Sequence, residues 1–134
     1  MTDALAYFTA KLQHETDASD VYAAQRAGED VVLVDVRSAA AWDQGHAVGA
    51  RHLPYREIAV RARDELPHDA EIIVYCWSPG CNAGAKAAVE LARRGFRVRE
   101  MIGGFEYWAR EGYPVESVDG PLPRVHDPLV GLVR

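Results

Sequence analysis

Two cysteines, Cys76 and Cys81, are the residues of this chain best suited to covalent chemistry, and they lie in one short segment. Cys76 follows the apolar stretch 72–75 (IIVY) and precedes Trp77, Ser78, Pro79, Gly80, Cys81 and Asn82. Small residues, glycine and proline favour a loop that turns back with its backbone N–H groups pointing inward. Those donors and the positive end of a following helix would stabilise a thiolate, the nucleophilic form of cysteine. The pattern predicts a cysteine nucleophile, although position alone fits an inert buried cysteine equally well.

The elements that must position this loop are indicated by hydrophobic patterning. Residues 31–36 (VVLVDV) form a β-branched run without alternation, which is typical of a strand buried on both faces. Further strands are expected at 47–53, 72–75 and 96–102, and helices at 4–12, 17–28, 39–42, 57–66, 83–94 and 104–112. Asn82 is expected to cap the helix after the loop. The alternation predicts one α/β domain with a central parallel sheet flanked by helices on both faces, and ligands bind at the carboxyl ends of such strands.

Composition limits the classes of function. The 134 residues suffice for one domain, and the net charge of −5 disfavours nucleic acid as a partner. No signal peptide or membrane-spanning run is recognisable, so a cytoplasmic protein with free thiols and no membrane partner is expected. The segment after Val115 is rich in proline and is expected to lack regular structure. Its apolar end leaves two arrangements open, a homodimer and a tail docked on its own domain.

Three groups of residues resemble the signatures of the rhodanese-like domain family, small single-domain bacterial type. The first is the segment 33–37 (LVDVR) with Trp42, 45–46 (GH), 49–50 (GA) and 53–54 (LP). The last is 103–104 (GG), Trp108 and 112–116 (GYPVE), near the end of the domain. Between them, Tyr75 and Cys76 stand before a glycine-containing loop and an alanine-rich helix, at the family's active-site position.

The resemblance implies a division of the chain and a chemistry. The resemblance covers residues 16–116, which we expect to form the rhodanese-like domain; patterning adds an N-terminal helix at 1–15 and an extended tail at 117–134 that we expect to dock. The resemblance implies a sulfurtransferase in which Cys76 takes sulfane sulfur from thiosulfate or a persulfide and holds it as a persulfide. The sulfur then passes to a thiol or protein acceptor, and no metal or organic cofactor is required.

The loop departs from the family pattern at its sixth position, where rhodaneses that use thiosulfate often carry arginine and this chain carries Cys81. The loss leaves open whether thiosulfate is the donor. Lys86 is one substitute for the missing charge, with a solvated lysine as the alternative. Asp35 and Arg37 end a core strand and are expected to support the pocket, as a buried ion pair rather than as substrate contacts. Trp77 either walls the loop or covers the core beside it.

Cys81 raises a second hypothesis. It could act as a resolving thiol that attacks a Cys76 persulfide or sulfenate and forms a disulfide, or it could be a small loop residue whose thiol faces inward. Two other functions compete with sulfur transfer. One is a phosphatase or arsenate reductase, which the absence of a loop arginine disfavours. The other is a non-catalytic or redox-sensing module, which the presence of Cys76 disfavours.

Overall fold

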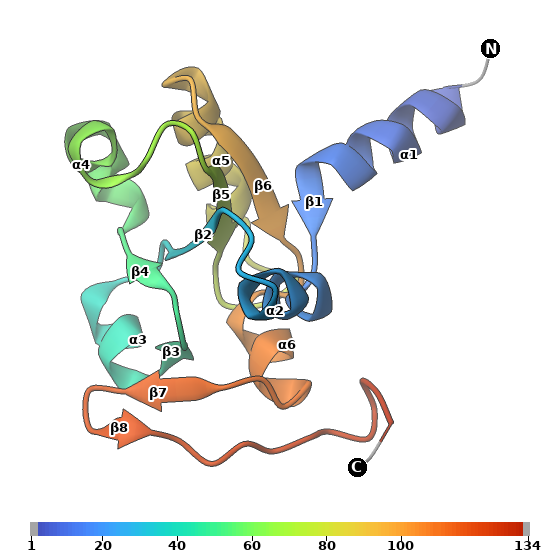
Figure 1. Ribbon diagram of the computed structural model, residues 1–134, viewed down its shortest axis with the longest axis vertical. Helices are drawn as coiled ribbons and strands as arrows, with labels where there is room; N and C mark the ends of the chain where they lie inside the picture. Colours follow the sequence, from blue (N-terminus) through green and yellow to red (C-terminus); the bar gives the residue numbers. More distant parts are fainter. Residues whose placement is uncertain (1–2, 133–134) are drawn as a thin grey trace.

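The computed structural model describes residues 3–132, and its elements follow the expected alternation (Figure 1). Helices and strands occur in this order: α1 (Asp3–His14), β1 (Glu15–Thr16), α2 (Ala18–Arg26), β2 (Val31–Asp35), α3 (Ala39–Gln44), β3 (His46–Ala47), β4 (Arg51–His52), a 3₁₀ turn (Tyr55–Glu57), α4 (Ile58–Glu65), β5 (Glu71–Tyr75), α5 (Ala83–Arg93), β6 (Arg97–Met101), α6 (Gly104–Arg110), β7 (Val115–Ser117) and β8 (Gly120–Pro121). No helix within the described range is long and apolar enough to cross a membrane.

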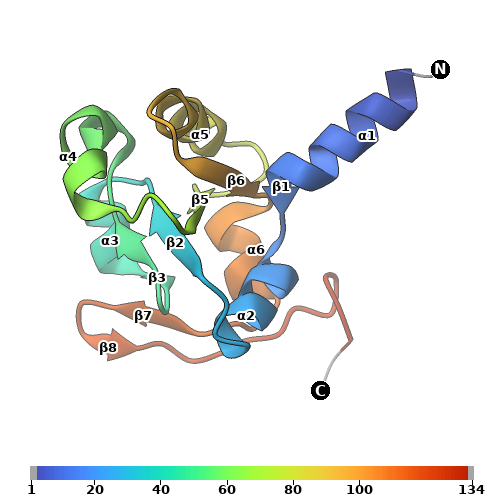
Figure 2. The ribbon, with the colours of Figure 1, turned by 45° about the horizontal axis from the view of Figure 1, so that its top comes forward.

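The central sheet is parallel and has the strand order β1-β6-β5-β2-β4 within residues 3–132. Alternate residues of β2 point to opposite faces, so Val32 and Val34 pack with α4 and α5, whereas Leu33 packs with α2 and α6. Figure 2 shows these helices on the two sides of the sheet. The fold is therefore the predicted α/β domain, and burial on both faces explains why the core strands are unbroken apolar runs.

Two expectations about the elements are wrong, and one strand, β1, was not expected. The strand expected at 47–53 is two short strands separated by a turn at Gly49, where φ is +90°. Its first half, β3, pairs with β7 in a small antiparallel sheet, and its second half, β4, pairs with β2. Residues 115–121 form the β7–β8 hairpin, although they were expected to be irregular. The two-residue edge strand β1 carries too few residues to show a periodic pattern.

The N-terminal helix forms as its pattern predicts, but its apolar face is not covered. Tyr7, Phe8 and Leu12 are 61 %, 56 % and 77 % exposed. α1 extends away from the body in both ribbon views (Figures 1 and 2). It contacts β6 and the short strand β1, which pairs with the end of β6. The helix thus contributes to the surface near the cysteine loop rather than to the core.

Candidate active site

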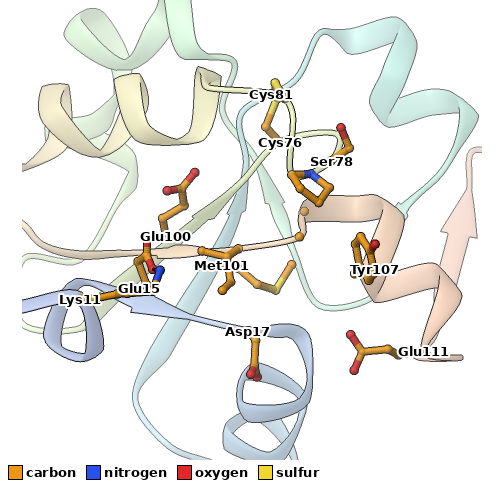
Figure 3. A pocket seen from close by; sticks show the side chains of 14 residues that line it. Lys11, Glu15, Asp17, Cys76, Ser78, Cys81, Glu100, Met101, Tyr107 and Glu111 are labelled. Carbon is orange, nitrogen blue, oxygen red and sulfur yellow. Dashed lines mark hydrogen bonds and ion pairs between the residues drawn. A yellow bond between two sulfur atoms is a disulfide. The ribbon is translucent and has the colours of Figure 1, made fainter. Parts of the chain in front are cut away.

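Cys76 lies directly after β5, at the carboxyl edge of the sheet where the fold predicts a ligand site. Its side chain is 5 % exposed and faces a pocket of about 480 Å³. Figure 3 shows this pocket between the cysteine loop, the end of β6, α6 and the junction of α1 with β1. Of the predicted loop residues, Cys76, Ser78, Pro79 and Cys81 line it. The predicted nucleophile therefore lies on the wall of a pocket that is large enough for a small molecule.

Cys76 and Cys81 are joined by a disulfide, with their Cα atoms 6.3 Å apart. The intervening chain turns back on itself because the N–H of Cys81 donates to the carbonyl of Ser78 (3.0 Å) across Pro79 and Gly80. The loop N–H groups were expected to point inward and donate to an anion. The N–H of Cys81 instead donates to the Ser78 carbonyl. The loop places both sulfur atoms together, and Cys81 is the more exposed of the two.

The start of α6 holds the loop from below. The N–H groups of Phe105 and Glu106 donate to the carbonyls of Cys76 and Trp77, each at 2.8 Å. Gly104 permits this contact, because a Cβ there would lie 2.7 Å from the Cys76 carbonyl oxygen and 2.8 Å from the Ser78 nitrogen. Its φ of +63° also favours glycine. The glycine pair of the sequence signature is thus where the helix meets the loop backbone.

A buried ion pair lies beneath the loop. Arg37 donates to both carboxylate oxygens of Asp35 (2.7 Å from Nη2 to Oδ2) and to the carbonyl of Gly45 (2.6 Å). The Tyr75 hydroxyl donates to the same carboxylate at 2.6 Å and accepts from the N–H of Ala47. Burial, followed by the charge of Asp35, raises the pKa of Tyr75 well above its usual value, so the hydroxyl keeps its proton.

Arg37 contacts the loop through aromatic rings and does not line the pocket. Its guanidinium carbon lies 4.4 Å from the ring centroids of both Trp77 and Phe105. Trp77 is 43 % exposed and lies outside the pocket lining, so it covers the buried ion pair instead of walling the pocket. Asp35 and Arg37 also lie outside the lining. These contacts support the loop from behind.

The pocket is acidic, a property that the sequence analysis missed. Its lining includes four carboxylates and one amine. The carboxylates are those of Glu15, Asp17, Glu100 and Glu111, and the amine is that of Lys11. Lys11 forms an ion pair with Glu15, so its charge is already matched. Burial, with the charge of Glu15 second, raises the pKa of Glu100, and burial followed by the charge of Asp17 raises that of Glu111. None of the lining residues is an arginine.

Other predicted site residues lie outside this pocket. Gly80 and Asn82 belong to the loop but not to the lining. Asn82 is the N-cap residue of α5, as expected, but its side chain forms no capping hydrogen bond. Lys86 is on the exposed face of α5 and does not replace the missing loop arginine in the lining. The carboxylates were missed because they come from two stretches that are far apart in sequence, residues 15–17 and 100–111.

Comparison with known proteins decides the family. The model of the rhodanese-like domain matches residues 17–111. The chain belongs to the rhodanese-like family. A protein named sulfurtransferase from Allochromatium vinosum is 37 % identical over 93 residues, which cover 69 % of this chain and 84 % of the relative. A protein of Pseudomonas putida named thiosulfate sulfurtransferase GlpE is 40 % identical over 96 residues, covering 71 % and 84 %.

A solved structure extends the similarity beyond the matched segment. The BH2092 protein from Bacillus halodurans superposes with a TM-score of 0.82 at 39 % identity, covering 88 % of this chain and 87 % of that one. In this rhodanese-like protein, the strand that ends before Cys76 and the glycine pair 103–104 that meets its loop both lie within the residues that the family model matches. At the family level, the relatives' names support a rhodanese-type transferase.

Proposed function

We propose that this rhodanese-like protein is a sulfurtransferase that carries sulfane sulfur as a persulfide on Cys76. The observation that carries the proposal is the place of Cys76, at the end of β5 and on the wall of the acidic pocket. The Cys76 thiolate would attack the outer sulfur of a donor, forming an S–S bond while the donor leaves as a thiolate or sulfite. A thiol or protein cysteine would then accept the outer sulfur. In the disulfide form the Cys76 sulfur is blocked, so reduction must come first.

Charge favours a persulfide over thiosulfate as the donor. Thiosulfate concentrates two negative charges beside the reacting sulfur, and four carboxylates with one paired lysine line the pocket. Like charges at close range raise the cost of binding, and no arginine fork compensates here. A persulfide borne by cysteine, glutathione or a protein carries less charge next to its outer sulfur. A reducing cytoplasm would supply such donors and acceptors.

The test is sulfur loading followed by intact mass. Reduced protein is incubated with thiosulfate or with glutathione persulfide, and its mass is read before and after cyanide. We expect glutathione persulfide to add to Cys81→Ser, in which Cys76 is the only cysteine, one sulfur atom that cyanide removes, and thiosulfate to add far less. Cys76→Ser should gain no such sulfur. Equal loading by both donors would contradict the charge argument without touching the role of Cys76.

The loop disulfide favours one second candidate. A rhodanese-like module that senses oxidation without transferring sulfur would form the same Cys76–Cys81 bond. The loading experiment separates the two functions. If reduced wild type and Cys81→Ser both fail to gain sulfur from either donor, sulfur transfer is excluded and the sensing function stands.

A further inference from the structure

We infer that Cys81 resolves the Cys76 persulfide, so that the protein reduces sulfane sulfur to hydrosulfide and ends in the disulfide form. The inference rests on the proposed function, because it begins from sulfur loaded on Cys76. It adds an activity that needs no external acceptor: reductive release of the sulfur within one loop. The starting observation is that the loop joins the two cysteines in the folded protein.

The backbone of the loop supports closure of this bond. The 6.3 Å between the Cα atoms lies inside the usual range for disulfides. The hydrogen bond from Cys81 to Ser78 and the bond from Phe105 to Cys76 are both present while the sulfurs are joined. Cys81 therefore reaches the Cys76 sulfur without loss of the contacts that hold the loop on α6.

The chemical step balances without any other oxidant. The Cys81 thiolate attacks Sγ of Cys76, the inner sulfur of the persulfide. A bond forms between the two cysteine sulfurs, and the bond from Cys76 Sγ to the outer sulfur breaks. The outer sulfur leaves with the electron pair as hydrosulfide, so the sulfane sulfur is reduced by two electrons and the two cysteines are oxidised by two. The proton of the Cys81 thiol passes to solvent or to the leaving hydrosulfide.

Proximity makes Cys81 a strong competitor of dissolved thiols. A group tethered by a short chain has an effective concentration on the order of mM, and fixed geometry raises that value much further. The turn at Ser78 fixes the position of Cys81 in this way. The acidic lining assists the second half of the step, because carboxylates repel an anionic product and favour its release.

Regeneration requires a dithiol reductant, which we assign by chemical class. An external thiolate can attack Cys81 more readily than Cys76, because Cys81 is partly exposed and Cys76 is 5 % exposed. Attack there forms a mixed disulfide on Cys81 and releases Cys76 as the thiolate. The second thiol of the reductant then frees Cys81, and the catalytic cysteine is ready for another donor.

The test is a single turnover under anaerobic conditions. Reduced wild type, Cys81→Ser, Cys81→Ala and Cys76→Ser are mixed with an equal amount of glutathione persulfide and no added thiol. We expect wild type to release hydrosulfide and to end two hydrogens lighter with no sulfur gained. The Cys81 variants should retain the added sulfur and release hydrosulfide at least about tenfold more slowly, as loss of an intramolecular thiol requires. Cys76→Ser should do neither.

The outcomes separate this inference from the proposed function. If wild type keeps the persulfide, forms no disulfide and releases hydrosulfide no faster than Cys81→Ser, Cys81 is not a resolving thiol, although sulfur transfer survives. If neither wild type nor the Cys81 variants take up sulfur, the proposed function fails first. Hydrosulfide release by Cys76→Ser at the wild-type rate would also overturn the inference, because it would arise without the persulfide.

Discussion

Arg37 is the residue that ties the sheet to the cysteine loop, and its charge is balanced by one carboxylate. Its side chain is 1 % exposed and that of Asp35 is 0 % exposed, so neither charge is screened by water. The ion pair, the Gly45 carbonyl and the rings of Trp77 and Phe105 surround the guanidinium. A charge in such a place is costly unless its partner is present.

Asp35→Asn is therefore expected to destabilise the protein by roughly 3–5 kcal/mol, the usual cost of leaving a buried charge without its partner. Urea denaturation of the reduced protein measures the change. Glu65→Gln is the matched control, since it removes the charge of an exposed partner of Arg61 and should leave the midpoint almost unchanged. Equal midpoints for Asp35→Asn and wild type would show that Arg37 does not depend on this carboxylate.

Glu100 is expected to make the stability of the protein depend on pH. Its pKa is raised above the ordinary 4.5 by burial and by Glu15, so the folded protein holds this proton more tightly than the unfolded chain. The stability that the protonated carboxyl provides is present in full below pH 4.5 and is lost as pH rises through the folded pKa. Glu100→Gln should therefore be more stable than wild type at pH 7, and the difference should shrink toward pH 4.

Thermal unfolding of wild type and Glu100→Gln between pH 4 and pH 8 measures this effect. Val60→Ala, at an 80 % exposed position on the far helix α4, should show no such pH trend. A difference between Glu100→Gln and wild type that is constant across the range would contradict the raised pKa as its cause.

The N-terminus of α6 determines where the cysteine loop lies. Its first N–H groups take the carbonyls of Cys76 and Trp77 as partners, and Gly104 lets the two backbones approach. A helix start with its own amides unsatisfied needs such acceptors. The element thus positions the nucleophile although none of its side chains is a predicted reactant.

In the Cys81→Ser background, where the added sulfur stays on Cys76, Gly104→Ala should displace the loop and lower sulfur loading at least about tenfold, because misplacement of reacting atoms by an ångström is costly. Gly28→Ala is the control. Gly28 has a similar φ of +71°, but a Cβ there meets nothing within 4 Å. Both variants should lose about 1–2 kcal/mol from the left-handed backbone, and only Gly104→Ala should also lose loading. Equal loading in the two variants would show that the close approach at Gly104 is unimportant.

At the scale of the whole molecule, the disulfide is expected to serve reactivity more than stability. It links residues five apart and closes a very short loop, whereas the core is formed by strands and helices on both sides of the sheet. Stabilisation by a disulfide grows with the length of the loop it closes.

Reduction should therefore lower the free energy of unfolding by no more than about 2 kcal/mol and leave the fold intact. Urea denaturation with and without dithiothreitol measures this, and Cys81→Ser should match the reduced protein in both conditions. The reactivity of Cys76 should differ between the two forms, because only the reduced protein has a free Cys76 thiol to react with glutathione persulfide. Unfolding of the protein on reduction would mean that the loop disulfide is structural.

Much of the fold could be predicted because its core strands carry a local signal. Residues buried on both faces of a parallel sheet must all be apolar, so β2 and β5 stand out as unbroken runs. The helix expected at 17–28 has an equally local signal, and the structure confirms it: Asp17 caps α2 by accepting from the N–H of Asp20, and Gly28 follows its end with a φ of +71°. Short strands such as β1 and β8 could not be found this way, because two residues form pairs but no pattern.

The candidate site also has some features with a local sequence signal and others without one. Three features of the site can be predicted from neighbouring residues alone: a cysteine follows a buried strand, a second cysteine lies in the same turn, and the loop lacks arginine. The joining of the two sulfurs and the acidic character of the pocket were decided by the tertiary structure. Glu15, Glu100 and Glu111 line one pocket because β1 pairs with β6 and α6 starts beneath the loop, and contacts between elements so distant along the chain leave no local trace.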